Sequence, residues 1–182
     1  SDGDAVDVKD ALRRGADVNL STRGYGMPLH MAIRRKDPNM VRLLMDYGAK
    51  VNVVGSMQWH EGRWILLLTA LSYAVYCDDG KGRIVQLLLD HGADPHGHPK
   101  AKMNGFPNEI TSLHAAAAFD KVGAATLLWK HGADPNAHDH DGKRPLHYAC
   151  SSGMARLLLS SGADPSAKDR LGNNTYAVVQ EA

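Results

Sequence analysis

A five-residue phrase, Gly-Ala followed by a charged residue, occurs five times in the 182-residue chain and constrains its fold more than any other feature. It begins at positions 15, 48, 92, 132 and 162, as GADVN, GAKVN, GADPH, GADPN and GADPS, so the intervals are 33, 44, 40 and 30 residues. Every copy except the first follows an apolar run with helical spacing, and a glycine in the left-handed conformation ends such a helix without a Cβ penalty. Self-similarity of this kind indicates a chain of stacked supersecondary units.

A second phrase follows each of the first four glycine phrases. It reads MPLHMA at 27–32, TALSYA at 69–74, TSLHAA at 111–116 and RPLHYA at 144–149. These phrases resemble the TPLHxA signature of the ankyrin-repeat family, and with the glycine phrases they cover nearly the whole chain. The resemblance implies an all-α ankyrin-repeat solenoid of stacked helix-turn-helix pairs with β-hairpin-like loops, in about four full repeats plus partial terminal units.

The repeat boundaries follow from the two phrases. We expect a single ankyrin-repeat domain over 1–182, with a partial repeat at 1–14, repeats at 15–47, 48–91, 92–131 and 132–161, and a partial C-terminal unit at 162–182. One unit cannot bury its own apolar face, so stability comes from stacking and the end units are atypical. The chain begins without Met and its first apolar pattern runs straight into a loop, so we expect a fragment of a longer protein.

Composition excludes several classes of function. Lys and Arg number 21 against 20 Asp and Glu, so the basic footprint of a dedicated nucleic-acid binder is missing and we expect no nucleic-acid partner. Two distant cysteines without CxxC spacing favour a reducing, intracellular setting, cytoplasmic or nuclear. The longest apolar run, 64–68, is far shorter than the roughly 20 residues that span a bilayer. We expect a monomer without a membrane partner.

Two extended loops in neighbouring repeats depart most from the family pattern. The loop over 48–69 is nine residues longer than that over 132–144, and the loop over 92–111 is seven longer. The two loops should project side by side. Insertions in repeat proteins go to loops on one face, often the binding face, and aromatic residues dominate interface hot spots. We therefore expect partner contacts from Trp59, His60, Glu61, Arg63, Trp64, Met103 and Phe106. The alternative is that Trp59, Trp64 and Phe106 only pack the loops onto the solenoid.

A second group of candidate residues comes from the first helices. By resemblance, ankyrin arrays bind partners on a concave face built from hairpin tips and first helices. The two variable positions after each second phrase map onto this face as Arg34/Arg35, Tyr76/Cys77, Ala118/Phe119 and Ser151/Ser152. One end of this strip is basic and its middle is aromatic, which suits a peptide or domain with an acidic part and an apolar anchor. We assign Arg34, Arg35, Tyr76 and Phe119 to the site; for the arginines, the alternative is a solvated charged edge.

The ten histidines raise the question of a metal site. By resemblance, the imidazoles of His30, His114 and His147 tie hairpin to helix, and His91 and His131 come just before a glycine stop. Two His-x-His pairs, at 96–98 and 138–140, lie in neighbouring hairpins, but closed structural zinc sites usually take four ligands. We expect no metal and no cofactor.

No catalytic motif is found. The chain lacks GxxxxGK[ST], HExxH and GxSxG, and its DDGKG stretch at 78–82 falls in a turn between helices. We expect no enzyme but a protein–protein interaction module or scaffold. The alternative is a regulatory or targeting ankyrin domain that acts in cis within a larger enzyme or channel. A third possibility, by resemblance, is that Asn19, Asn52 and Asn136 are hydroxylated.

One departure is a shortening. The segment 146–162 is three residues shorter than 29–48, so the helix pair around Met154 must lose most of a turn. We attach no chemistry to this change.

Overall fold

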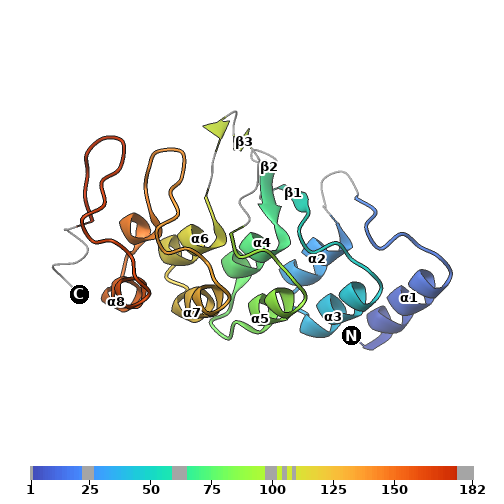
Figure 1. The fold of residues 1–182 in the computed structure, drawn as a ribbon. Coiled ribbons are helices and arrows are strands. Elements are labelled where there is room, and N and C mark those ends of the chain that lie inside the picture. Colours follow the sequence, from blue (N-terminus) through green and yellow to red (C-terminus); the bar gives the residue numbers. More distant parts are fainter. Residues whose placement is uncertain are drawn as a thin grey trace.

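The computed structural model of the protein describes residues 2–21, 27–58, 65–96, 102–103, 106–107 and 110–175. In this part of the chain eight α-helices and one 3₁₀ helix stand in two parallel rows (Figure 1). The all-α solenoid implied by the family resemblance is confirmed. One row holds the second helices, α1 (Asp2–Arg13), α3 (Pro38–Asp46), α5 (Arg83–Asp90), α7 (Val122–Lys130) and α8 (Ser152–Ser160). The other holds the first helices, α2 (Pro28–Arg34), α4 (Ala70–Cys77), α6 (Ser112–Ala118) and the 3₁₀ helix η1 (Pro145–Tyr148).

Local chemistry sets the ends of these helices. The Thr111 hydroxyl accepts from the His114 backbone N–H at 3.4 Å, and His114 Nδ1 accepts from the Thr111 N–H at 3.2 Å, which closes a capping box at the start of α6. Pro28 and Pro38 stand in the first turns of α2 and α3, where the missing N–H costs nothing. Gly132 follows α7 with φ of +93°, a left-handed conformation that favours glycine.

The core lies between the two rows. First helices contact their neighbours along one row, second helices along the other, and each pair packs on itself. The largest fully buried apolar side chains come from every described repeat: Leu29, Ile33, Val41, Leu71, Leu88, Leu113, Leu128, Leu146, Met154 and Leu158. Burial of each such side chain contributes about 1.5–3 kcal/mol relative to exposure, so the stack itself holds the fold.

Two of the three histidines of the second phrase, His114 and His147, connect hairpin to helix as the resemblance implies. Because His114 Nδ1 accepts a hydrogen bond, Nε2 carries the proton and donates to the Lys143 carbonyl of the next hairpin at 3.0 Å. His147 repeats the arrangement, with Nδ1 3.0 Å from the Arg144 N–H and Nε2 3.4 Å from the Asn173 carbonyl. His91 and His131 donate to carbonyls in the last turns of α5 and α7. These four imidazoles therefore serve the framework.

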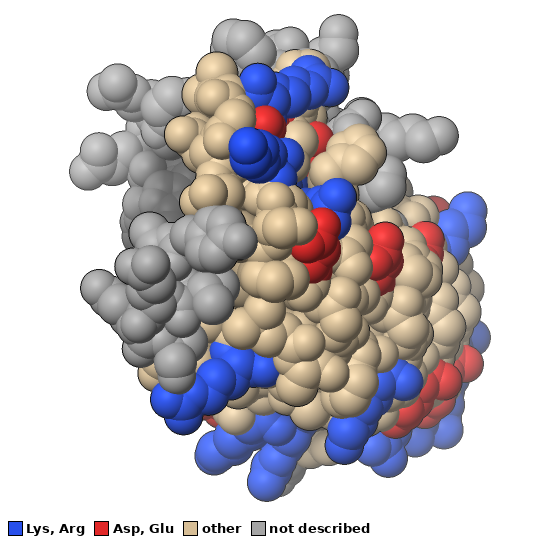
Figure 2. All heavy atoms as spheres, turned by 60° about the vertical axis from the view of Figure 1, so that its left-hand side comes forward, with Lys and Arg blue, Asp and Glu red and all other residues tan. Residues whose placement is uncertain are grey.

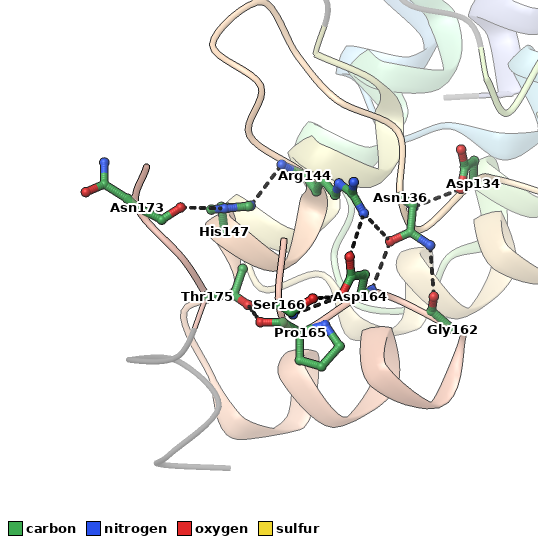
Figure 3. A network of polar contacts seen from close by, with 10 residues as sticks. All are labelled: Asp134, Asn136, Arg144, His147, Gly162, Asp164, Pro165, Ser166, Asn173 and Thr175. Carbon is green, nitrogen blue, oxygen red and sulfur yellow. Dashed lines mark hydrogen bonds and ion pairs between the residues drawn. The ribbon is translucent and has the colours of Figure 1, made fainter. Parts of the chain in front are cut away.

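The asparagines of the glycine phrase bridge successive repeats. Asn136 Nδ2 donates to the Gly162 carbonyl at 2.9 Å, and its Oδ1 accepts from the Asp164 N–H at 2.9 Å (Figure 3). Asn52 makes the same pair of bonds to Gly92 and Asp94, and Asn19 bonds Gly48 and Lys50. These clamps set the spacing and the register of the hairpins.

Both extended loops contain an antiparallel hairpin. Strand β1 (Val54–Gln58) pairs with β2 (Ile65–Thr69), with Val54 opposite Thr69, and β3 (Lys102–Met103) pairs with β4 (Phe106–Pro107). Residues of β2 lie against β3, and both hairpins rise from the same edge of the solenoid (Figure 1). The expectation that the two loops project side by side is confirmed at these strands.

The shortening in the last full repeat falls on its first helix. The family phrase forms only the single 3₁₀ turn of η1, whereas α8 has nine residues, as α3 and α7 do. The Ser151 hydroxyl accepts from the Met154 N–H at 3.1 Å and so caps the start of α8. The loss of most of a turn that the sequence predicts therefore leaves the second helix intact.

Candidate functional site

The predicted site residues on the first helices lie where these helices end. Arg34 is the last residue of α2, Tyr76 lies in the last turn of α4, and Phe119 is the residue that ends α6. Because α2 contacts α4 and α4 contacts α6, the sequence-distant residues belong to neighbouring positions on one edge of the stack. The structure thus brings the helical half of the predicted site together.

Three aromatic rings form a row across two of these helix ends. Tyr73 and Tyr76, one helical turn apart on α4, stack with ring centroids 6.5 Å apart, and Phe119 meets Tyr76 edge-on with centroids 5.0 Å apart. Tyr73 is buried, Tyr76 is half-buried and Phe119 is 51% exposed. Edge-to-face pairs stabilise by about 0.5–1.5 kcal/mol beyond area burial. The buried ring of Tyr73 therefore supports the row at one end, and Phe119 presents an apolar ring to solvent at the other.

Basic side chains lie beside the row. Arg34, Arg35 and Lys36 are exposed. Burial raises the pKa of the Cys77 thiol, while the positive charges of Lys36, Arg34 and Lys121 act in the opposite direction. Burial also raises the pKa of the Tyr73 hydroxyl, and the neighbouring Cys77 adds to this effect. Thiol and hydroxyl are therefore neutral near pH 7 and add no negative charge beside these cations.

Figure 2 shows how charge is distributed over one face of the molecule. Lys and Arg side chains gather along the lower edge, where Asp and Glu lie beside them on the right, and a second basic group lies near the top above further Asp and Glu side chains. A charge-balanced chain thus carries its cations in separate groups, which gives local attraction to acidic partners in spite of a net charge of +1.

A cavity of about 250 Å³ opens between the turns of two neighbouring helix pairs. One wall comes from the turn between α2 and α3 and the other from the turn between α4 and α5. Its lining is partly apolar and partly charged: Ile33, Lys36, Pro38, Ala74, Cys77, Asp78, Asp79, Lys81, Arg83 and Ile84. Lys36 and Cys77 directly follow Arg35 and Tyr76 in sequence, so the cavity adjoins the predicted strip.

The loop half of the predicted site is only partly placed. Trp59, His60, Glu61, Arg63 and Trp64 lie outside the described residues. Met103 is in β3 and Phe106 in β4, where they are opposite each other in the hairpin register. These seven assignments stay predictions.

Sequence reasoning missed Tyr73 and the cavity. Tyr73 precedes Tyr76 by three residues, a spacing that puts two side chains on one face of a helix. The cavity has a signal in turn length, because Val85 lies 14 residues after Leu71 whereas Val41 lies 12 after Leu29 and Ala125 lies 12 after Leu113. Two extra residues in the turn after α4 could have directed attention to it.

The described residues also bear on metal ions and membranes. In the part of the chain that the structure describes, no three His, Cys, Asp or Glu side chains come close enough to hold a metal ion. No described helix is both long and apolar enough to cross a membrane. His98, one member of the histidine pairs, lies outside the described residues.

Comparison with known proteins gives consistent matches. A family model for ankyrin repeats, three copies, matches residues 2–98 and 96–169. An ankyrin repeat protein of Acanthamoeba polyphaga mimivirus is 28% identical over 141 residues, which cover 78% of this chain and 16% of the relative. The transient receptor potential channel pyrexia of Drosophila melanogaster is 31% identical over 142 residues, 77% of this chain and 13% of the channel. Human ankyrin repeat and SOCS box protein 6 is 33% identical over 144 residues, 76% of this chain and 30% of that protein. The chain therefore spans less than a third of each of these relatives.

Proposed function

The chain belongs to the ankyrin-repeat family, and from this premise we propose that it binds a partner protein through its concave face and its two extended hairpin loops. Ankyrin repeats are in general protein-interaction modules rather than catalysts. The observation that carries the proposal is the aromatic row of Tyr73, Tyr76 and Phe119, because it ends in a half-exposed ring beside a basic edge.

The chemistry of the partner follows from this edge. An exposed aromatic ring with packed support is a suitable hot spot, since such anchors supply most of the affinity of an interface. Arg34 and Arg35 beside it favour a negatively charged neighbour and raise the association rate with acidic partners. We therefore propose a peptide or domain that places an apolar side chain on Phe119 and acidic residues along α2. A reducing, intracellular setting, cytoplasmic or nuclear, suits such a module.

The extended hairpins supply the second half of the proposed site. Their adjacent strands rise next to the first helices, and their length exceeds what the repeat framework requires (Figure 1). We propose that Trp59, His60, Glu61, Arg63 and Trp64 of the first hairpin contact the partner, together with Met103 and Phe106 of the second.

Affinity capture from native extract, followed by binding measurements on variants, tests the helical half of the site. We expect Phe119→Ala to weaken binding of the captured partner about tenfold or more, since loss of a hot spot typically costs 2 kcal/mol or more. Trp129→Ala is the matched control, because Trp129 is 39% exposed on α7 in the row of second helices. Equal affinities of the Phe119→Ala variant and the wild type would place the interface elsewhere.

Shortening of the first hairpin tests the other half. Replacement of residues 55–64 by a short turn should leave helical content intact by circular dichroism and weaken partner binding about tenfold or more. If the shortened chain unfolds, the tryptophans are packing residues and the alternative interpretation is correct. If it folds and binds with unchanged affinity, the hairpin is not part of the interface.

A second candidate function is action in cis within a longer polypeptide. It is favoured by the lengths of the relatives, of which this chain spans 13–30%, and one of them is named as a channel. In that case the partner segment belongs to the same polypeptide. Peptides of the parent polypeptide among the captured material would favour this candidate, and their absence beside an unrelated captured partner would exclude it.

A further inference from the structure

The turn between α4 and α5 has an internal structure of its own. The Asp78 carboxylate accepts from the Gly82 N–H at 2.9 Å and from the Gly80 N–H at 3.1 Å, and Asp79 accepts from the Lys81 N–H at 3.1 Å. Together with neighbouring cations, this bond to Lys81 holds the pKa of Asp79 below its usual value. Both carboxylates are therefore engaged by N–H groups of the turn that carries them.

The same turn is braced against the following repeat. Lys121 Nζ donates to the Asp78 carbonyl at 2.7 Å. Gly82 is buried so closely against α7 that a Cβ on it would lie 2.7 Å from Leu127 Cδ1. These contacts fix the turn on the side of α7, so the 250 Å³ cavity on its other side, toward α2 and α3, has a preformed wall.

The lining of the cavity combines apolar surface with an excess of positive charge. Pro38 and Ile84 contribute partly exposed aliphatic carbon, and Ile33 and Ala74 line the cavity as buried residues. Three cations lie around them, Lys36, Lys81 and Arg83, and none makes an ion pair within the described residues. Two aspartates against three cations leave the lining with one net positive charge, and the aspartate oxygens already accept the N–H groups of the turn. The cavity therefore attracts an anion that also has an apolar stem.

The cavity is open to solvent, and its volume is of the order of one long side chain. A cavity of about 150 Å³ holds a benzene molecule, whereas pockets for drug-sized ligands and cofactors occupy roughly 300–1,000 Å³. At about 250 Å³ this cavity lies between the two and fits one long side chain. A glutamate has the required parts, because its methylene groups can lie on the aliphatic carbons while its carboxylate meets the Lys and Arg side chains.

We propose that the cavity between the α2–α3 and α4–α5 turns is a docking site for a single acidic side chain, a glutamate, of the partner protein. The inference rests on the proposed function in that the occupant belongs to the partner. It adds a charged subsite at the helix turns to the aromatic row at the ends of the first helices.

Nuclear magnetic resonance of the ¹⁵N-labelled chain tests the cavity without knowledge of the partner. The probes are acetyl-Gly-Glu-Gly amide and its glutamine counterpart, acetyl-Gly-Gln-Gly amide, which lack an apolar side chain for the aromatic row and differ only in the carboxylate. We expect the glutamate peptide to shift the amides of Lys36, Cys77 and Ile84 saturably, with an affinity about tenfold above that of the glutamine peptide, as for the loss of one charge-assisted hydrogen bond. Equal affinities for the two peptides, or shifts confined to other residues, would overturn the proposal.

Two charge-removing variants serve as a matched pair. Arg83→Gln should weaken binding of the glutamate peptide about tenfold. Arg42→Gln removes an exposed cation of α3 outside the cavity and should leave this affinity unchanged. Inorganic phosphate is the third probe. If phosphate binds the cavity more tightly than the glutamate peptide does, the cavity is a site for free phosphate and the proposal fails.

The peptide titration and partner capture can fail independently. Phe119→Ala should leave the affinity for the glutamate peptide unchanged and should weaken binding of the captured partner. If Phe119→Ala weakens partner binding but the peptide shifts no cavity amide, the proposed docking site is refuted and the aromatic site stands. If the peptide binds in the cavity but Phe119→Ala leaves the affinity for the captured partner unchanged, the aromatic site is refuted and the docking site stands.

Discussion

The asparagine clamp between the last two glycine phrases allows a stability prediction with an internal control. Asn136→Ala removes three hydrogen bonds, to the Gly162 carbonyl at 2.9 Å, from the Asp164 N–H at 2.9 Å and from Arg144 Nη1 at 3.1 Å (Figure 3). Each contributes about 0.5–1.5 kcal/mol net. Because the three partners are at least partly exposed and can bind water instead, we expect a loss near the low end of the sum, about 2 kcal/mol. The melting temperature should fall by about 4–8 °C.

Ser166→Ala is the control because Ser166 holds the equivalent position in the last phrase. Among the described residues its hydroxyl bonds only the Asp164 carboxylate of its own phrase, at 2.7 Å on the surface, so its loss should change stability by less than about 0.5 kcal/mol. Thermal unfolding measures both variants, and hydrogen exchange at the Asp164 amide reports local opening of the C-terminal unit. Equal melting temperatures for the two variants would refute the idea that the asparagine holds neighbouring repeats together.

Three further outcomes test the fold. Leu88→Ala truncates a side chain that is 0% exposed and should cost about 2–5 kcal/mol in chemical denaturation, against less than about 0.5 for Arg42→Ala. Tyr148→Phe removes the hydroxyl that donates to buried Asp139 at 2.5 Å, and should cost about 1–3 kcal/mol in the same assay. The Ser166 hydroxyl and Arg144 hold the pKa of Asp164 below its usual value. The stabilisation that the ionised Asp164 carboxylate gives to the folded state is therefore complete above about pH 5 and is lost as the pH falls through the folded pKa. The acid limb of a pH–melting profile should therefore be shallower for Asp164→Asn.

The framework could be predicted because each of its signals is local. The Gly stops, the Pro and Thr helix starts and the histidine of the second phrase act within a few residues or on the next copy of the same phrase. His114 illustrates this, since one ring nitrogen caps its own helix and the other binds the next hairpin. Register and helix order followed directly from counting such residues.

The site could be predicted only in part because it depends on how repeats pack. The variable positions identified Tyr76 and Phe119, but their edge-on contact and the supporting Tyr73 depend on the fit of α4 against α6. The shortening is a similar case. The sequence shows that three residues are missing from this repeat but does not show which helix is shortened. The structure shows that Ser151 caps the start of α8, so the loss falls on the first helix, which forms only η1.

The aromatic row and the cavity share the end of one helix, and this has a consequence for the proposed partner. Tyr76 belongs to the row and Cys77, the next residue of α4, lines the cavity. Consecutive residues on an α-helix point about 100° apart, so the two subsites lie on adjacent sides of the same helix end. Phe119 of the following repeat and Lys36 of the preceding one flank this end. We therefore expect a short partner segment to reach both subsites at once, and the pattern that we propose for this partner is an apolar residue and a glutamate close together in sequence.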